Sequence, residues 1–178
     1  MTIEKITLGG GCFWCIETIF KRVKGVKDVI SGYSAGDNID PTYQQICSGE
    51  TNHAEVVQIT FDNSQVDLDT LLTVFFGIHD PTTLNRQGAD IGTQYRSIIL
   101  TRNDQQQKIA LAKIVDLDKA EKFTDKIVTE VIPFEQFYSA ESYHQDYYEN
   151  NQENQYCQLV VAQKIQKFLS EYSHLLKD

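Results

Sequence analysis

The order in which strand-like and helix-like apolar periods follow one another restricts the fold of this chain more than any other feature. Apolar side chains that recur every three or four residues predict two helices, one around residues 16–23 and one around residues 68–76. Runs rich in β-branched and aromatic residues predict four strands, at residues 3–8, 27–33, 54–61 and 95–101. The order βαββαβ is typical of the ferredoxin-like split βαβ fold, an α+β two-layer sandwich whose helices cover one face of a mainly antiparallel sheet.

The rest of the chain is predicted to be a C-terminal extension of coil and helix. It has a Gln-, Lys- and Ala-rich helix near residues 104–121, a strand near 127–132 and an aromatic-rich stretch at 134–148. A final helix carries Ile165, Phe168, Leu169 and Tyr172. No internal repeat or linker divides the 178 residues, so we expect a single domain spanning residues 1–178.

The charge balance excludes several classes of partner. The formal net charge is −9 and Lys and Arg form no block, which argues against nucleic acid and against anionic membranes. The stretch from Met1 to Leu8 has no signal-peptide core and no run of eighteen apolar residues exists, so we expect a cytoplasmic protein. Four cysteines in such a protein indicate thiol chemistry or metal binding more readily than structural disulfides.

A glycine-rich segment, Gly9-Gly10-Gly11-Cys12-Phe13-Trp14-Cys15, lies where the first strand should turn into the first helix. At a helix N-terminus, free amide groups and the helix dipole stabilise a thiolate, so we predict a lowered pKa and a nucleophilic role for Cys12. The alternative for a single cysteine is a buried, inert thiol, but the glycine turn and the nearby Cys15 favour chemistry. Phe13 and Trp14 would form an apolar wall for a methyl group, or simply part of the core.

Glu55 is predicted to lie on the buried face of the strand at residues 54–61. In a strand it shares a face with Val57, Ile59 and Phe61, and no cation is evident beside it. A carboxyl in that position is either paired structurally or desolvated, and desolvation raises its pKa towards neutrality as a general acid requires.

Four further side chains are candidates for the site or its recycling. Tyr43 and Tyr95 lie in segments that could supply phenol hydroxyls, although most tyrosines are packed rings, and Asp90 could supply a second carboxylate. Cys157 follows a polar stretch and is predicted to lie in a mobile segment able to carry a thiol to another site. We expect Cys47 to be a buried structural thiol.

Six segments together resemble, in order, the motifs of the A-type peptide methionine sulfoxide reductases, a likeness that spans about residues 5–160. They are Gly11-Cys12-Phe13-Trp14, Gly32-Tyr33-Ser34, Pro41-Thr42-Tyr43, His53-Ala54-Glu55-Val56, Asp90-Ile91-Gly92-Thr93-Gln94-Tyr95-Arg96-Ser97 and Glu141-Ser142-Tyr143-His144-Gln145.

This resemblance implies a catalytic scheme. Cys12 would attack the sulfur of a methionine S-sulfoxide, free or in a protein, and Glu55 would protonate the oxygen. Tyr43 and Tyr95 would hydrogen-bond that oxygen, while Phe13 and Trp14 hold the methyl group and Asp90 orders the neighbouring hydrogen bonds. The reaction leaves Cys12 as a sulfenic acid.

The resemblance also implies how the enzyme is regenerated. A second thiol condenses with the sulfenic acid, and thioredoxin reduces the resulting disulfide in a monomeric enzyme without metal or organic cofactor. Cys157 matches the usual C-terminal resolving position and is favoured, but Cys15 stands where glycine is commoner. Either thiol, or a relay through both, remains open.

Two other classes of protein compete with this interpretation. A thioredoxin-like disulfide oxidoreductase would use Cys12 and Cys15 but leaves Glu55 and Tyr95 without a role. A zinc-stabilised interaction domain would use Cys12, Cys15, Cys47 and either Cys157 or a histidine, although the spacing contains only one close pair.

Overall fold

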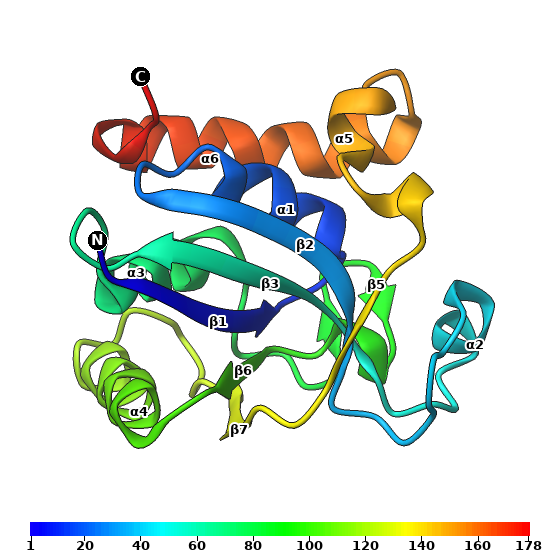
Figure 1. The fold of residues 1–178 in the computed structure, drawn as a ribbon, viewed down its shortest axis with the longest axis horizontal. Helices are drawn as coiled ribbons and strands as arrows, with labels where there is room; N and C mark the ends of the chain where they lie inside the picture. Colours follow the sequence, from blue (N-terminus) through cyan, green and yellow to red (C-terminus); the bar gives the residue numbers. More distant parts are fainter.

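Six strands form one curled sheet in the order β7-β6-β1-β3-β2-β8, and helices lie against it (Figure 1). The structure is a computed structural model that describes residues 1–178. The strands are β1 (Ile3–Gly9), β2 (Val26–Ser34), β3 (Ala54–Asp62), β6 (Ile98–Thr101), β7 (Glu130–Pro133) and β8 (Phe137–Ser139). The helices that cover the sheet are α1 (Phe13–Lys21), α3 (Leu68–Ile78), α4 (Asp104–Lys119) and α6 (Ala162–Tyr172).

The four predicted core strands occupy the middle of this sheet in the order β6-β1-β3-β2, and each neighbouring pair is antiparallel. The predicted α+β class is confirmed. The sheet is wider than predicted, because β7 pairs in parallel with β6 at one edge and β8 pairs with β2 at the other. The sequence did not predict β8, a three-residue strand whose pairing depends on contacts more than a hundred residues away.

The main core lies between one face of the sheet and the helices α1, α3 and α6. Side chains of α1 such as Ile16 and Phe20 belong to the same buried cluster as Phe75 of α3, Phe168 of α6 and Val57 of β3. Alternation along β3 sends Val56 to the opposite face, into a smaller cluster with Ile98 and Leu100 of β6. Glu55, which precedes Val56, therefore faces the helices.

Two long connections contain short elements that the sequence did not predict. The segment at residues 34–52 includes α2 (Tyr43–Ser48), and residues 80–94 include the hairpin of β4 (Arg86–Gln87) and β5 (Asp90–Ile91). The predicted strand at 95–101 begins only at Ile98, because residues before it form the 3-10 turn η1 (Thr93–Tyr95). These connections meet at the end of the sheet from which α1 starts (Figure 1).

The C-terminal region continues through several short turns into α6. These are η2 (Ser142–His144), α5 (Tyr147–Asn150), the π-helical turn η3 (Cys157–Val161) and, after α6, η4 (Ser173–Leu175). α6 runs alongside α1 across one side of the molecule (Figure 1). None of the helices combines the length and the apolar composition needed to cross a lipid bilayer.

Candidate active site

Cys12 is the N-cap residue of α1. The glycine turn before it lies close to two other segments of the chain, β3 at Glu55 and the turn η1 at Tyr95. Gly9 passes so close to β3 that a Cβ atom there would lie 2.8 Å from the carbonyl oxygen of Glu55. Gly11 has φ +86°, a left-handed conformation that favours glycine, and its N–H donates to the carbonyl of Tyr95 at 3.1 Å. The turn therefore holds Cys12 between the segments that carry Glu55 and Tyr95.

The pKa of the Cys12 thiol is raised well above its ordinary value, so the prediction of a lowered pKa is wrong. Burial is the largest cause, since the residue is only 8% exposed, and the neighbouring Glu55 and Cys15 add to it. A hydrogen bond from the backbone N–H of Trp14 lowers the pKa but does not compensate. Cys12 is therefore a thiol at neutral pH, and another group must take its proton before it can act as a nucleophile.

Glu55 faces the helices on β3, as predicted from strand alternation, and is 2% exposed. Burial raises its pKa to about 8, and the nearby Asp90 contributes in the same direction. The backbone N–H of Phe13 donates to Glu55 Oε1 at 3.2 Å and lowers the pKa, but no lysine or arginine contributes. The carboxyl is thus desolvated and largely protonated at neutral pH.

Two half-buried phenols lie within electrostatic reach of this carboxyl. Burial raises the pKa of both Tyr43 and Tyr95, and the charge of Glu55 raises each further, so both remain neutral hydrogen-bond donors. Glu141 supports Tyr43: it accepts from the Tyr43 backbone N–H at 3.2 Å and from the hydroxyl of Tyr33 at 3.0 Å. Two donors from different loops therefore converge on the neighbourhood of Glu55.

An aromatic cluster from the C-terminal region surrounds Trp14. The ring of Tyr147 stacks on the indole with a centroid separation of 3.6 Å and an interplanar angle of 6°. Trp14 Nε1–H donates to His144 Nδ1 at 3.1 Å, and Tyr156 packs edge-on against the indole. The hydroxyl of Tyr156 donates to Asp90 Oδ2 at 2.6 Å, which links this cluster to the hairpin at residues 86–91.

Sequence reasoning missed three of these aromatic side chains, namely His144, Tyr147 and Tyr156. Their only signal was the aromatic-rich stretch and the motif that contains His144. The contacts to Trp14 span more than 125 residues of chain, so spacing along the sequence could not reveal them.

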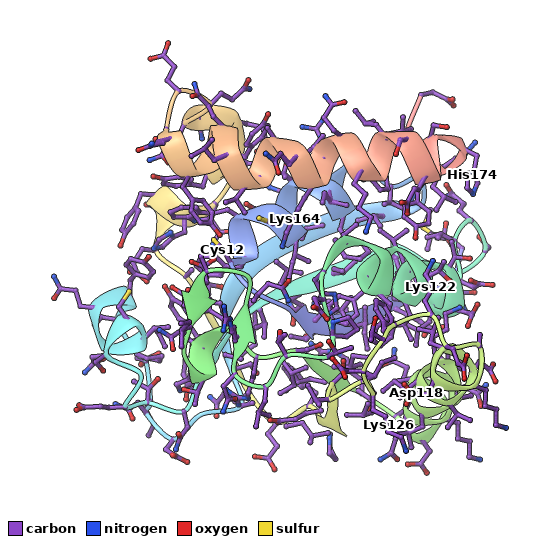
Figure 2. The ribbon with its side chains drawn as sticks, turned by 180° about the vertical axis from the view of Figure 1, so that it is seen from behind. Cys12, Asp118, Lys122, Lys126, Lys164 and His174 are labelled. Carbon is purple, nitrogen blue, oxygen red and sulfur yellow. The ribbon has the colours of Figure 1, made fainter.

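Cys15 is the thiol nearest to Cys12 along the chain. Cys15 is buried one turn into α1, and its N–H donates to the carbonyl of Cys12 at 3.2 Å. Burial raises the pKa of Cys15 to about 11, an effect that the charge of Lys164 on α6 opposes (Figure 2). The thiol of Cys157 also lies close enough to raise the pKa of Cys15.

One prediction about the other cysteines is wrong and one stays a prediction. Cys157 is fully buried as the first residue of η3, where its N–H donates to Asn154 Oδ1 at 3.4 Å, and the mobility of its segment stays a prediction. Cys47 was predicted to be buried but is exposed, because α2 turns the adjacent Ile46 towards the core. The side chain of Cys47 lies near the Tyr43 phenol and contributes to its raised pKa.

A surface cavity of about 730 Å³ does not coincide with this site. It opens between α6 and residues 122–125, and its wall includes His79, Lys122 and Lys164 but no cysteine (Figure 2). No group of three or more His, Cys, Asp or Glu side chains has the geometry to hold a metal ion, so the four-cysteine zinc site has no structural basis.

The site combines the buried Cys12 thiol with the Glu55 carboxyl of raised pKa, and the thiols of Cys15 and Cys157 lie nearby. This combination is typical of thiol-dependent oxidoreductases. The family model described as peptide methionine sulfoxide reductase matches residues 4–176. The chain is 53% identical to the peptide methionine sulfoxide reductase MsrA of Saccharolobus solfataricus over 98% of each chain. Identity to the MsrA of Chromobacterium violaceum is 49%, covering 99% of this chain and 100% of that one. This chain belongs to the peptide methionine sulfoxide reductase family.

Solved structures agree with this assignment. Reduced Mxr1 from Saccharomyces cerevisiae matches with a TM-score of 0.80 and 35% identity, covering 87% of this chain and 89% of that one. Mxr1 in complex with Trx2 matches with a TM-score of 0.56 and 26% identity over 82% and 84% of the two chains. The family assignment decides against the two alternative interpretations of the sequence, a thioredoxin-like disulfide oxidoreductase and a zinc-stabilised interaction domain.

Proposed function

We propose that this enzyme reduces methionine S-sulfoxide, free and in polypeptides, with Cys12 as nucleophile and Glu55 as general acid. The observation that carries the proposal is the juxtaposition of the two groups: the Glu55 carboxyl is hydrogen-bonded to the residue next to Cys12 and raises the pKa of the thiol. A sulfoxide sulfur becomes electrophilic when its oxygen is protonated, and Glu55 with a pKa of about 8 still carries a proton at neutral pH.

In the first step the Cys12 sulfur attacks the sulfoxide sulfur and a bond forms between the two sulfurs. Glu55 donates its proton to the oxygen and recovers one from the thiol of Cys12, so the carboxyl is unchanged. The hydroxyl then transfers from the substrate sulfur to the Cys12 sulfur while the bond between the two sulfurs breaks, so methionine leaves and Cys12 becomes a sulfenic acid. Tyr43 and Tyr95 donate hydrogen bonds to the oxygen while negative charge develops on it, which their raised pKa values support.

Phe13 and Trp14 hold the methyl group of the substrate in this scheme. The support is that Phe13 is fully buried and that Trp14 is kept in place by stacking and by an indole hydrogen bond. Asp90 orders this region through its hydrogen bond from Tyr156. An apolar pocket beside protonated donors would favour a methyl sulfoxide over fully polar compounds.

The recycling step is proposed as a relay through Cys15 to Cys157. Cys15 lies close enough to Cys12 to raise its pKa, and Cys157 affects Cys15 in the same way, which supports this order of contact. The Cys12 sulfenic acid condenses with the Cys15 thiol and releases water. The Cys157 thiolate then attacks Cys15, which frees Cys12 as a thiol and moves the disulfide to Cys15 and Cys157.

Thioredoxin is the proposed reductant, in the cytosol and acting on a monomeric enzyme. It would supply two electrons and two protons by thiol–disulfide exchange, returning both cysteines to thiols. The solved complex of Mxr1 with Trx2 supports this choice, since Mxr1 shares the fold of this chain. Because Cys157 is fully buried, exchange requires local opening of the segment around η3.

The experiment that tests the proposal is the reaction of reduced protein with methionine S-sulfoxide in the absence of a reductant. With excess substrate we expect two equivalents of methionine per enzyme from wild type, because the relay returns Cys12 to a thiol that reacts once more. We expect none from Cys12→Ser, whose far-UV circular dichroism should match wild type. The exposed Cys47→Ser serves as the matched control and should still form methionine. Methionine formation by Cys12→Ser would overturn the assigned nucleophile.

A further inference from the structure

Glu17 is a fully buried carboxylate on α1 that the chemistry proposed above does not use. Both of its carboxylate oxygens accept from the backbone N–H of Asp146, each at 3.1 Å. Lys21 Nζ lies 3.1 Å from Glu17 Oε1 and also contacts the carboxylate of Asp146. Burial raises the pKa of Glu17, while the hydrogen bond from Asp146 and the charge of Lys21 oppose this shift.

The residue held by Glu17 is the one that starts α5. Asp146 has φ +54°, a left-handed conformation that a non-glycine residue adopts only when its surroundings hold it there. α5 then lies against α1 (Figure 1), where Thr18 Oγ1 donates to Glu149 at 2.5 Å. Glu149 is the exposed member of this contact, whereas Thr18 and Glu17 are both buried.

Tyr147 follows Asp146 directly, and it is the residue that stacks on Trp14. The hydroxyl of Tyr147 accepts from Asn154 Nδ2 at 3.5 Å. Asn154 Oδ1 in turn accepts from the backbone N–H groups of Tyr156 at 2.9 Å and Cys157 at 3.4 Å. A continuous series of contacts thus leads from Glu17 to the aromatic wall of the site.

We propose that Glu17 is a positioning residue whose carboxylate, by holding the Asp146 backbone, keeps Tyr147 stacked on Trp14 and so shapes the methyl-binding wall of the substrate site. The expected effect on substrate binding rests on the proposed function. The expected effect on the position of the Tyr147 ring does not depend on the proposed function. A carboxylate buried only for packing would be replaceable by an uncharged isostere without effect on the site.

The test compares Glu17→Gln with wild type in two measurements. Trp14 is the only tryptophan, so acrylamide quenching of its fluorescence reports the stack without substrate. Glutamine has one acceptor oxygen where the carboxylate offers two and loses the charge that pairs with Lys21, so we expect the quenching constant to rise at least about twofold. We expect KM for methionine sulfoxide to rise about tenfold, with kcat changed by less than about threefold.

Glu149→Gln is the matched control, because it neutralises an exposed carboxylate between the same two helices and leaves the contact of Glu17 with Asp146 intact. It should leave quenching and KM near wild type. Tyr147→Leu removes the stack directly and should raise KM as Glu17→Gln does, and the double variant should add nothing to either single change. Additive effects on KM, or a folded Glu17→Gln protein with unchanged quenching, would overturn the positioning role.

Glu17→Asp covers the case in which the glutamine variant does not fold. It keeps the charge but withdraws the carboxylate by one methylene from the Asp146 N–H, and it should show the same direction of change in quenching and KM. Unchanged values in Glu17→Asp would contradict the proposal. If wild type itself reduced no sulfoxide, the proposed function would fail while the quenching comparison still decided the position of Tyr147.

Discussion

The backbone N–H of Phe13 donates to Oε1 of Glu55 at 3.2 Å, which ties the first turn of α1 to the acid on β3. Phe13 directly follows Cys12, so the nucleophile and the carboxyl are held by one local geometry. This bond favours the charged form of Glu55, yet burial outweighs it and the pKa rises to about 8. The site therefore keeps a proton where the substrate oxygen needs one.

Replacing Glu55 by glutamine should abolish the supply of that proton while preserving shape. We expect the rate of methionine formation in a single turnover at pH 7 to fall by about 10²–10⁴-fold, the range typical of a lost general acid. Glu50→Gln, which changes an exposed carboxyl a few residues before the strand, should keep the wild-type rate. Rapid-quench measurement of methionine gives both values, and equal rates for wild type and Glu55→Gln would assign the proton to another group.

The same substitution should change how stability depends on pH. The pKa of Glu55 is raised from 4.5 to about 8 in the folded state, so below pH 4.5 both folded and unfolded chains carry the proton. As pH rises to 8 the unfolded chain releases it and the folded chain retains it, which lowers the free energy of unfolding. Glutamine does not titrate, so the free energy of unfolding of Glu55→Gln does not fall for this reason.

The unfolding free energy of Glu55→Gln relative to wild type should therefore increase by roughly 3–5 kcal/mol between pH 4.5 and pH 8.5. Urea unfolding at several pH values measures this difference, and other titrating groups cancel because both proteins share them. A relative stability that stays constant with pH would mean that Glu55 is ionised in the folded protein.

The sequence predicted the elements of the core better than it predicted the environment of individual thiols. Apolar periodicity is local, so β1, α1, β3 and α3 lie close to their predicted positions. The pKa of Cys12 depends on burial by segments far along the chain, and the helix-terminus argument considered only its own helix. Cys47 was wrongly predicted to be buried, because the short helix α2 that exposes it was not predicted.

The partners of Trp14 illustrate the same limit. Its own motif indicated a functional role, but the residues that hold it lie between His144 and Tyr156, a segment with no helical or strand period. Glu55 is the opposite case. Strand alternation alone placed it on the buried face, because the side-chain period of a strand is local.

Tyr43 and Tyr95 should each contribute to stabilising charge on the substrate oxygen. Replacing either by phenylalanine removes one hydroxyl donor, and we expect about a tenfold or greater loss in kcat/KM for each. The double variant should lose more than either alone, because the two donors come from different loops. Tyr138→Phe, a change on β8 outside the Glu55 neighbourhood, is the control. Steady-state kinetics with methionine sulfoxide measures kcat/KM for each variant. Wild-type values in both single variants would show that neither phenol stabilises charge on the substrate oxygen.

The order of the thiol relay predicts different products from two single substitutions. In Cys157→Ser the sulfenic acid should still condense with Cys15, so mass mapping after one turnover should find a Cys12–Cys15 disulfide. In Cys15→Ser the fully buried Cys157 has to reach Cys12 by local opening, so the sulfenic acid should persist longer and be trapped by dimedone. Wild type should accumulate the Cys15–Cys157 disulfide. A Cys12–Cys157 disulfide formed equally fast in wild type and Cys15→Ser would instead make Cys157 the direct resolving thiol.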